Sequence, residues 1–165
     1  MSLGSVLFRD GEHVLVLTRT FPAPLEDVWA SVTEPERLAR WIGSWTGDPA
    51  SGHVEFRMLF EGEDAAPETM EIRLCEPPRR LHLTSRYGDQ VWPMDLELGH
   101  ADGVTTLTFS QHGVTRELVG DVGPGWDYYL DRLVDASSGA DPSARVWDDY
   151  AATGDHYTGQ AAFRA

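Results

Sequence analysis

The sequence of 165 residues contains a single cysteine, Cys75. A lone cysteine excludes an internal disulfide, and no histidine or second cysteine stands near Cys75 at the spacing of metal ligands. The six histidines are scattered along the chain in the same way. We therefore interpret Cys75 as a structural residue and predict neither a metal site nor a cofactor.

Long apolar runs are also missing. No stretch approaches 18 consecutive apolar residues, which excludes a membrane-spanning helix. The first residues, MSLGSVLFRDGEHV, lack the basic segment, apolar core and small-residue cleavage site of a secretory signal peptide. These absences predict a cytoplasmic protein that does not insert into a membrane.

Positive charge is scarce. The chain has no lysine, and its 13 basic residues face 27 acidic ones, for a formal net charge of −14. Such a field repels phosphate backbones unless a compact basic patch overrides it. The only adjacent basic pair is Arg79-Arg80, so we expect no nucleic-acid partner.

The apolar residues that are present first follow a strand pattern and then a helical one. Residues 13–21 alternate apolar and polar side chains and predict a strand. After Pro24, apolar residues recur at i, i+3, i+4 and i+7 over 25–32, which predicts a helix. Residues 33–36 match a capping box with proline at the first helical position, so a second short helix is predicted, ending at Gly43.

The pattern returns to alternation after Gly52. The alternating segments are 54–60, 70–74, 81–87, 92–98 and 107–109, separated by turn-forming residues. Together with the first strand they predict a six-stranded antiparallel sheet with one apolar face. From Val122 the period is helical again, and Gly139 suits the C-terminal cap of one long helix.

A sheet with one apolar face must be covered, and the C-terminal helix is the only predicted element long enough to cover it. The fold class is therefore α+β, with residues 1–139 as one domain. Residues 140–165 form a polar tail that is too rich in aromatic residues to be disordered. We expect this tail to pack partly on the domain, with one short helix near 144–152.

Two motifs carry a family resemblance. FPAPLEDVWASVTEPERLARWIG near the start and HGVTRELVGDVGPGWDYYLDRLVD near the end, with the meander between them, resemble the SRPBCC or START-like superfamily over residues 13–139. The branch is similar to the homologues of the activator of the heat-shock-protein-ninety ATPase. The resemblance implies a helix-grip fold, in which a strongly curved sheet wraps round the long helix and leaves a cavity. Many members of this superfamily bind lipids, sterols, polyketides or other apolar molecules there.

In such a fold the site residues would be inward strand positions and the inner face of the helix. Met and aromatic side chains suit an adaptable apolar pocket, although they suit an ordinary core equally well. The candidates are Phe56, Met58, Met70, Ile72, Trp92, Met94, Phe109, Trp126, Tyr129, Leu130 and Leu133. Trp41 and Trp45 are placed by the resemblance at the open end of the grip, where they would either close the cavity or plug the core.

Three polar residues are further candidates. Ser85 and Tyr87 share the inward register of the strand at 81–87, and His112 ends the last strand where it could face the cavity mouth. A buried hydroxyl or imidazole needs a hydrogen-bond partner, which a ligand could supply. The alternative is bonding to nearby backbone for the hydroxyls and a solvated turn for His112.

No motif of nucleophilic, phosphate-binding or zinc-dependent catalysis occurs in the chain. Our first hypothesis is therefore non-catalytic binding of a small apolar or amphipathic molecule. The second is a polyketide cyclase-like or hydrolytic enzyme in the same cavity, which would need convergent polar groups. The third is an interaction module that contacts a chaperone or regulator, which would need a filled core and an exposed apolar patch.

Overall fold

The computed structural model describes residues 2–63 and 65–164. Within these residues, eight strands form one antiparallel sheet in the order β1-β2-β8-β7-β6-β5-β4-β3. The strands are β1 Ser5–Arg9, β2 Glu12–Phe21, β3 Gly43–Thr46, β4 His53–Met58, β5 Glu68–Glu76, β6 Arg80–Tyr87, β7 Gln90–Ala101 and β8 Val104–His112. The predicted antiparallel α+β helix-grip is confirmed, but the predicted number of six strands is wrong.

The two unpredicted strands, β1 and β3, lie at the two edges of the sheet. β1 is joined to β2 by a tight turn in which Asp10 and Gly11 both have positive φ, as a hairpin of this length requires. Only one residue of β1, Val6, is buried, so the strand shows no apolar alternation. β3 begins at Gly43, where the sequence predicted only the end of a helix.

Two short helices, α1 Leu25–Thr33 and α2 Pro35–Leu38, follow β2 as predicted. The predicted capping box is wrong, because Thr33 is the last residue of α1 and its hydroxyl donates to the Trp29 carbonyl (2.8 Å). Glu34 is the N-cap of α2 and makes no side-chain capping bond, while Pro35 takes the first helical position. A threonine that bonds back to position i−4 is not available as a cap for the next helix.

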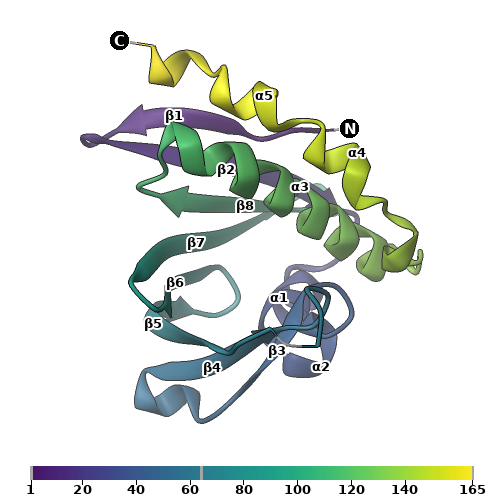
Figure 1. The fold of residues 1–165 in the computed structure, drawn as a ribbon. Coiled ribbons are helices and arrows are strands. Elements are labelled where there is room, and N and C mark those ends of the chain that lie inside the picture. Colours follow the sequence, from purple (N-terminus) through teal and green to yellow (C-terminus); the bar gives the residue numbers. More distant parts are fainter. Residues whose placement is uncertain (1, 64, 165) are drawn as a thin grey trace.

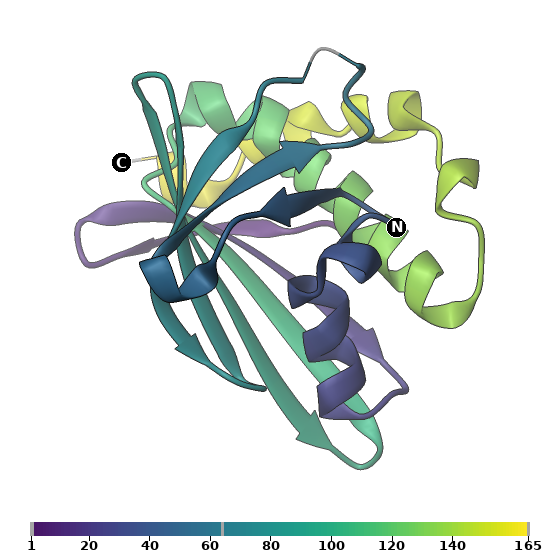
Figure 2. The ribbon, with the colours of Figure 1, turned by 90° about the horizontal axis from the view of Figure 1, so that it is seen from below.

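The long helix α3, Arg116–Ser138, begins six residues before the predicted start. The hydroxyl of Thr115 caps it by accepting from the Leu118 amide (3.1 Å), and Gly139 ends it with a positive φ, as predicted. Figure 1 shows α3 lying across the sheet over β2 and β8, from which the sheet bends away through β7 to β3. Figure 2 shows α1 beside the end of β7 where the chain turns into β8, and α2 lies next to β3.

Residues of the predicted tail run along α3 on its outer side (Figure 1). They form α4, Trp147–Ala151, and α5, Gly154–Thr158, within and beyond the predicted helix. Tyr157 of α5 is fully buried, and its ring lies against Gly123 of α3, where a Cβ atom would come within 2.5 Å of it. Gly120 and Gly123, which lack side chains, thus allow α5 to approach α3 closely.

None of the helices in residues 2–63 and 65–164 is long and apolar enough to span a membrane. Side chains of β2 and β8 are deeply buried beneath α3, and Leu15, Leu17 and Leu107 have almost no exposed surface. On the other half of the sheet, the inner face and α3 diverge.

Candidate functional site

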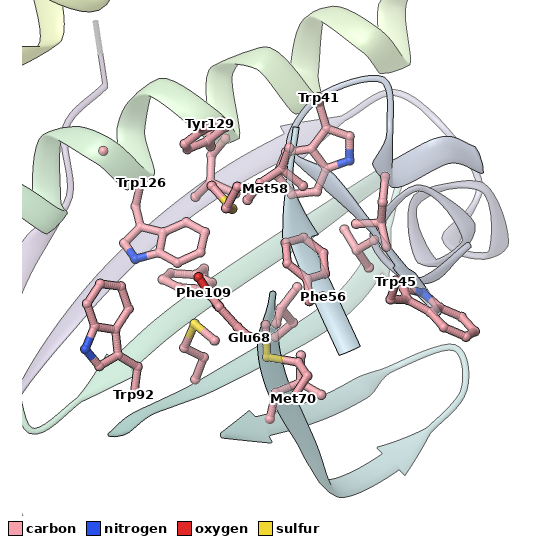
Figure 3. A pocket seen from close by; sticks show the side chains of 18 of the residues that line it. Trp41, Trp45, Phe56, Met58, Glu68, Met70, Trp92, Phe109, Trp126 and Tyr129 are labelled. Atoms are coloured by element: carbon pink, nitrogen blue, oxygen red, sulfur yellow. The ribbon is translucent and has the colours of Figure 1, made fainter. Parts of the chain in front are cut away.

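A cavity of about 820 Å³ lies between the inner face of the curved sheet, α3 and the α1–α2 segment. Its wall draws on β3 to β8, on α3 and on Trp147 of α4. Figure 3 shows aromatic and methionine side chains converging on this space from the sheet and from α3. The volume lies within the range of small-molecule sites in proteins.

Most of the residues that the sequence nominated lie on this wall. They are Trp41, Trp45, Phe56, Met58, Met70, Ile72, Tyr87, Trp92, Met94, Phe109, Trp126, Tyr129 and Leu130. Inward strand positions could be read from the sequence because alternate side chains of a strand share one face. Residues of the wall that the sequence did not nominate include Phe60, Tyr128 and Trp147.

Three nominated residues lie elsewhere. Leu133 is fully buried in the packed core between α3 and the sheet. Ser85 is buried on the inner face but lines a small adjacent cleft of about 90 Å³ rather than the cavity. His112 lies on the outer face of the sheet, because the inward residue at the end of β8 is Gln111, and a shift of one residue exchanges the faces.

The surroundings of His112 are ionic. Its Nδ1 lies 3.0 Å from a Glu12 oxygen and its Nε2 lies 2.8 Å from Asp95 Oδ2, while Arg73 binds the other oxygen of Asp95 (3.0 Å). Burial alone would raise the pKa of Asp95, but the hydrogen bonds from His112 and Arg73 outweigh it and lower that pKa below its usual value. His112 therefore stabilises the outer face of the sheet and does not face the cavity mouth.

Three of the five tryptophans that line the cavity use their N–H groups within the protein. Trp41 donates to the Ser31 carbonyl (2.9 Å) and Trp45 donates to the Thr33 carbonyl (2.8 Å), so both fasten α1 to the segment that follows α2. Trp126 of α3 donates to a glutamine side chain on β8 (2.8 Å). The part of each indole that remains for the cavity is its apolar ring.

The polar wall groups that stand out are three carboxylates, Glu61, Glu68 and Asp121. The Tyr129 hydroxyl donates to Glu61 (2.9 Å), and the Ser85 hydroxyl donates to Glu68 (2.7 Å). Figure 3 shows the Glu68 side chain directed into the cavity. The sequence analysis missed Glu68, although its position two residues before Met70 places it on the same face of β5.

Burial, followed by the hydrogen bond to Glu61, raises the pKa of Tyr129 well above its ordinary value. The phenol therefore keeps its proton at neutral pH and acts as a hydrogen-bond donor. This pair fixes Glu61 against α3 at one side of the cavity.

Three aromatic residues of the wall are also well exposed and so mark where the cavity opens to solvent. Phe60, Tyr87 and Trp147 expose 42%, 52% and 44% of their surface. Trp147 comes from α4 and meets Tyr128 of α3 edge to face, with ring centroids 5.4 Å apart. The C-terminal segment thus contributes to the cavity wall.

A buried polar network holds α3 in place behind the cavity. Arg19 of β2 binds Asp127 and Asp131 of α3 at 2.9 Å each, and the Tyr157 hydroxyl donates to Asp127. Burial raises the pKa of Asp127 despite its hydrogen bonds from Tyr157 and Arg19. The Gly4 amide completes the network by donating to the Tyr157 oxygen (2.8 Å).

Across the described ranges, no group of three or more His, Cys, Asp and Glu side chains has the arrangement of a metal site. Cys75 lines the cavity as a free thiol on β5. The chemistry of the wall is therefore that of an apolar, aromatic surface with carboxylates.

Comparison with known proteins agrees with this architecture. Residues 22–137 match the family model of the Activator of Hsp90 ATPase homolog 1-like protein. The chain belongs to this family. No functionally curated protein is detectably similar to it in sequence.

Solved structures share the fold of this family member. The crystal structure of CalU16 from Micromonospora echinospora is 24% identical, with a TM-score of 0.76 over 100% of this chain and 98% of that one. A Bordetella parapertussis protein is 22% identical, with a TM-score of 0.73 over 90% and 85% of the two chains. DynU16, a protein of the dynemicin biosynthetic locus, is 25% identical, with a TM-score of 0.67 over 78% of this chain and 49% of that one. The helix-grip predicted from the resemblance is thereby confirmed.

Proposed function

We propose that the protein binds a small apolar or amphipathic molecule in the cavity between the sheet and α3, without transforming it. The observation that carries this proposal is the apolar cavity of about 820 Å³. Protein interiors are normally packed as densely as organic crystals, so the apolar side chains that line a cavity of this size make fewer dispersion contacts with the protein than core side chains do. A ligand that fills it would supply those contacts.

The wall suits an adaptable binding site. Met58, Met70 and Met94 provide flexible, polarisable side chains, and the tryptophan rings provide large apolar faces that are held in place by their N–H bonds. DynU16 belongs to a biosynthetic locus, which is consistent with a small-molecule ligand in this fold. A cytoplasmic location stays a prediction from the sequence.

The other two hypotheses find less support. An enzyme in this cavity would need convergent polar groups, whereas the wall carboxylates Glu61 and Glu68 each accept a hydrogen bond from a side chain of the protein and the rest of the wall is mostly apolar. An interaction module of the kind that the family name suggests would have a filled core. The hollow beneath α3 therefore favours ligand binding over an interaction module.

Native mass spectrometry of the freshly purified protein tests the proposal directly. We expect a stoichiometric adduct that is released on denaturation and has the mass of an apolar small molecule. If the protein is apo, titration with the neutral fluorescent dye N-phenyl-1-naphthylamine is expected to show one saturable site.

Gly125 offers a variant that blocks the cavity without disturbing the fold. It lines the cavity from α3, and a Cβ atom there would have no neighbour within 4 Å. Gly125→Leu should place its side chain in the cavity and weaken dye binding about tenfold, whereas Gly125→Ala should bind normally. Equal dye affinity for wild type and Gly125→Leu would place the dye outside the cavity and refute the proposal.

A further inference from the structure

The charges on the cavity wall are all of one sign. Glu61, Glu68 and Asp121 line it, and within residues 2–63 and 65–164 no arginine or histidine side chain does so. None of these three carboxylates forms an ion pair with another described residue. A ligand that brings a negative charge into this cavity would therefore meet only repulsion.

A guanidinium close to the wall, that of Arg132, is already occupied. Arg132 is buried, donates to the carbonyls of Trp41 (3.0 Å) and Pro142 (2.9 Å), and lies 4.1 Å over the Phe60 ring. With the N–H groups of Trp41, Trp45 and Trp126 also engaged, the cavity offers few donors to a carboxylate or phosphate ligand. Fatty acids and similar anions are consequently disfavoured.

Glu68 is the carboxylate best placed to receive a positive charge. It lies at the inward register of β5, and Ser85 holds one of its oxygens at 2.7 Å. Glu68, Tyr87 and Trp92 line both the cavity and the small adjacent cleft of about 90 Å³, so the cleft opens from the cavity beside the carboxylate. Figure 3 shows Glu68 and Trp92 on neighbouring parts of the wall.

A carboxylate flanked by aromatic rings is the arrangement that recognises an ammonium group. The carboxylate supplies a charge-assisted hydrogen bond, and the faces of Tyr and Trp rings attract cations through their quadrupoles. The net charge of −14 also favours the approach of a cation from solution.

We propose, resting on the proposed function above, that the ligand is an apolar molecule bearing an amine. Its protonated amine binds Glu68 beside Tyr87 and Trp92, and its apolar part fills the larger cavity toward Phe56 and Trp45. Ser85 is a positioning residue that orients the Glu68 carboxylate. The Glu68 carboxylate beside the small cleft and the apolar cavity together account for both halves of such a molecule.

Three ligands of equal chain length test this inference: decylamine, decanol and decanoic acid, each below its micellar concentration. Displacement of N-phenyl-1-naphthylamine at neutral pH should show decylamine binding about tenfold more tightly than decanol, and decanoic acid most weakly. This comparison needs only the wild-type protein, so it does not depend on any variant folding.

Glu68→Gln should then weaken decylamine about tenfold while leaving decanol within about twofold. The matched control is Glu71→Gln, which removes the same charge from the outer face of the same strand, where Glu71 pairs with Arg86 (2.6 Å). We expect this control to bind decylamine as wild type does. An equal loss in both variants would mean that decylamine senses only the overall charge and would overturn the inference.

The outcomes also separate this inference from the proposed function. Tight binding of decanol without preference for decylamine would refute the amine and leave the apolar cavity site intact. Failure of the dye and of all three ligands to bind would refute both proposals.

Discussion

Gly123 and Gly125 lie two residues apart on α3 and face opposite surroundings. A Cβ atom at Gly123 would come within 2.5 Å of the buried Tyr157 ring, whereas one at Gly125 would enter open space in the cavity. Glycine costs a helix about 1 kcal/mol relative to alanine because it loses more backbone entropy on folding. The same substitution should therefore act in opposite directions at these two positions.

We expect Gly125→Ala to raise the free energy of unfolding by about 0.5 to 1 kcal/mol. Gly123→Ala should lower it by about 1 to 3 kcal/mol, because the added methyl group displaces a buried aromatic ring. Urea unfolding followed by tryptophan fluorescence measures both. Stabilisation by Gly123→Ala would show that α5 does not pack on α3 as described.

Asp95 gives the fold a dependence on pH. Hydrogen bonds from His112 and Arg73 hold its pKa below the unfolded value of about 3.9, so its contribution to stability is present above that pH. It is lost as the pH falls through the lower pKa of the folded state. We expect Asp95→Asn to lower the thermal midpoint at pH 7, with the difference from wild type shrinking below about pH 4. A difference that grows in acid would contradict this assignment.

At the scale of single residues, alternation predicted the apolar wall but not its charges. Met70 and Ile72 could be assigned to the inner face, and the same alternation places Glu68 there. A glutamate at the end of a strand is also common in a solvated turn, so the sequence alone did not identify Glu68 as a wall residue. His112 was placed on the wrong face because the last residues of a strand carry no flanking alternation to fix the register. Only the three-dimensional structure shows that the Ser85 hydroxyl donates its hydrogen bond to the Glu68 carboxylate.

At the scale of elements, one buried hydroxyl links α5 to α3. The Tyr157 hydroxyl donates to Asp127 and accepts from the Gly4 amide, and all of these groups are buried. Burial and the hydrogen bond to Asp127 raise the pKa of Tyr157, so the phenol stays protonated. Removing the hydroxyl would leave the buried carboxylate of Asp127 and the buried amide of Gly4 with fewer partners.

Tyr157→Phe should therefore destabilise the protein by about 1 to 3 kcal/mol in urea unfolding, because both partners lose a buried hydrogen bond. Tyr87→Phe is the matched control, since the Tyr87 side chain is about half exposed. We expect the control to unfold within about 0.5 kcal/mol of wild type. Equal stability of Tyr157→Phe and wild type would mean that the C-terminal segment contributes little to holding α3.

The elements that the sequence missed share a physical cause. β1 and β3 are short edge strands, and each takes its stability from pairing with one longer neighbour rather than from an apolar face of its own. The first turns of α3, residues 116–121, were missed because Gly120 is a poor helix former. Gly120 is tolerated there because α5 packs against it, which is a contact between distant parts of the chain.

At the scale of the whole molecule, one sheet serves two different purposes. Its first half, β1, β2 and β8, is closed against α3 and the C-terminal helices, and its second half, β3 to β7, curves away round the cavity (Figure 1). The helix-grip could be predicted because its motifs and its alternation between sheet and helix extend over most of the chain. The point at which the sheet separates from α3 depends on the curvature of the sheet. No local pattern of residues in the sequence determines that curvature.

This division predicts an asymmetry in how the molecule responds to loss of apolar side chains. Leu107 is fully buried in the closed half, and Leu96, on the neighbouring strand, lines the cavity. Leu107→Ala should cost about 3 to 5 kcal/mol of unfolding free energy, because it opens a new void among packed atoms. Leu96→Ala should cost less than about 2 kcal/mol, since one side of that leucine faces the cavity and its truncation loses fewer contacts with the protein.

A saturating ligand separates the two variants further. It should widen the difference in unfolding free energy between wild type and Leu96→Ala, because the bound ligand contacts Leu96 on its cavity side. The corresponding difference for Leu107→Ala should stay unchanged. Equal costs for the two variants, with and without ligand, would show that both halves of the sheet are packed alike.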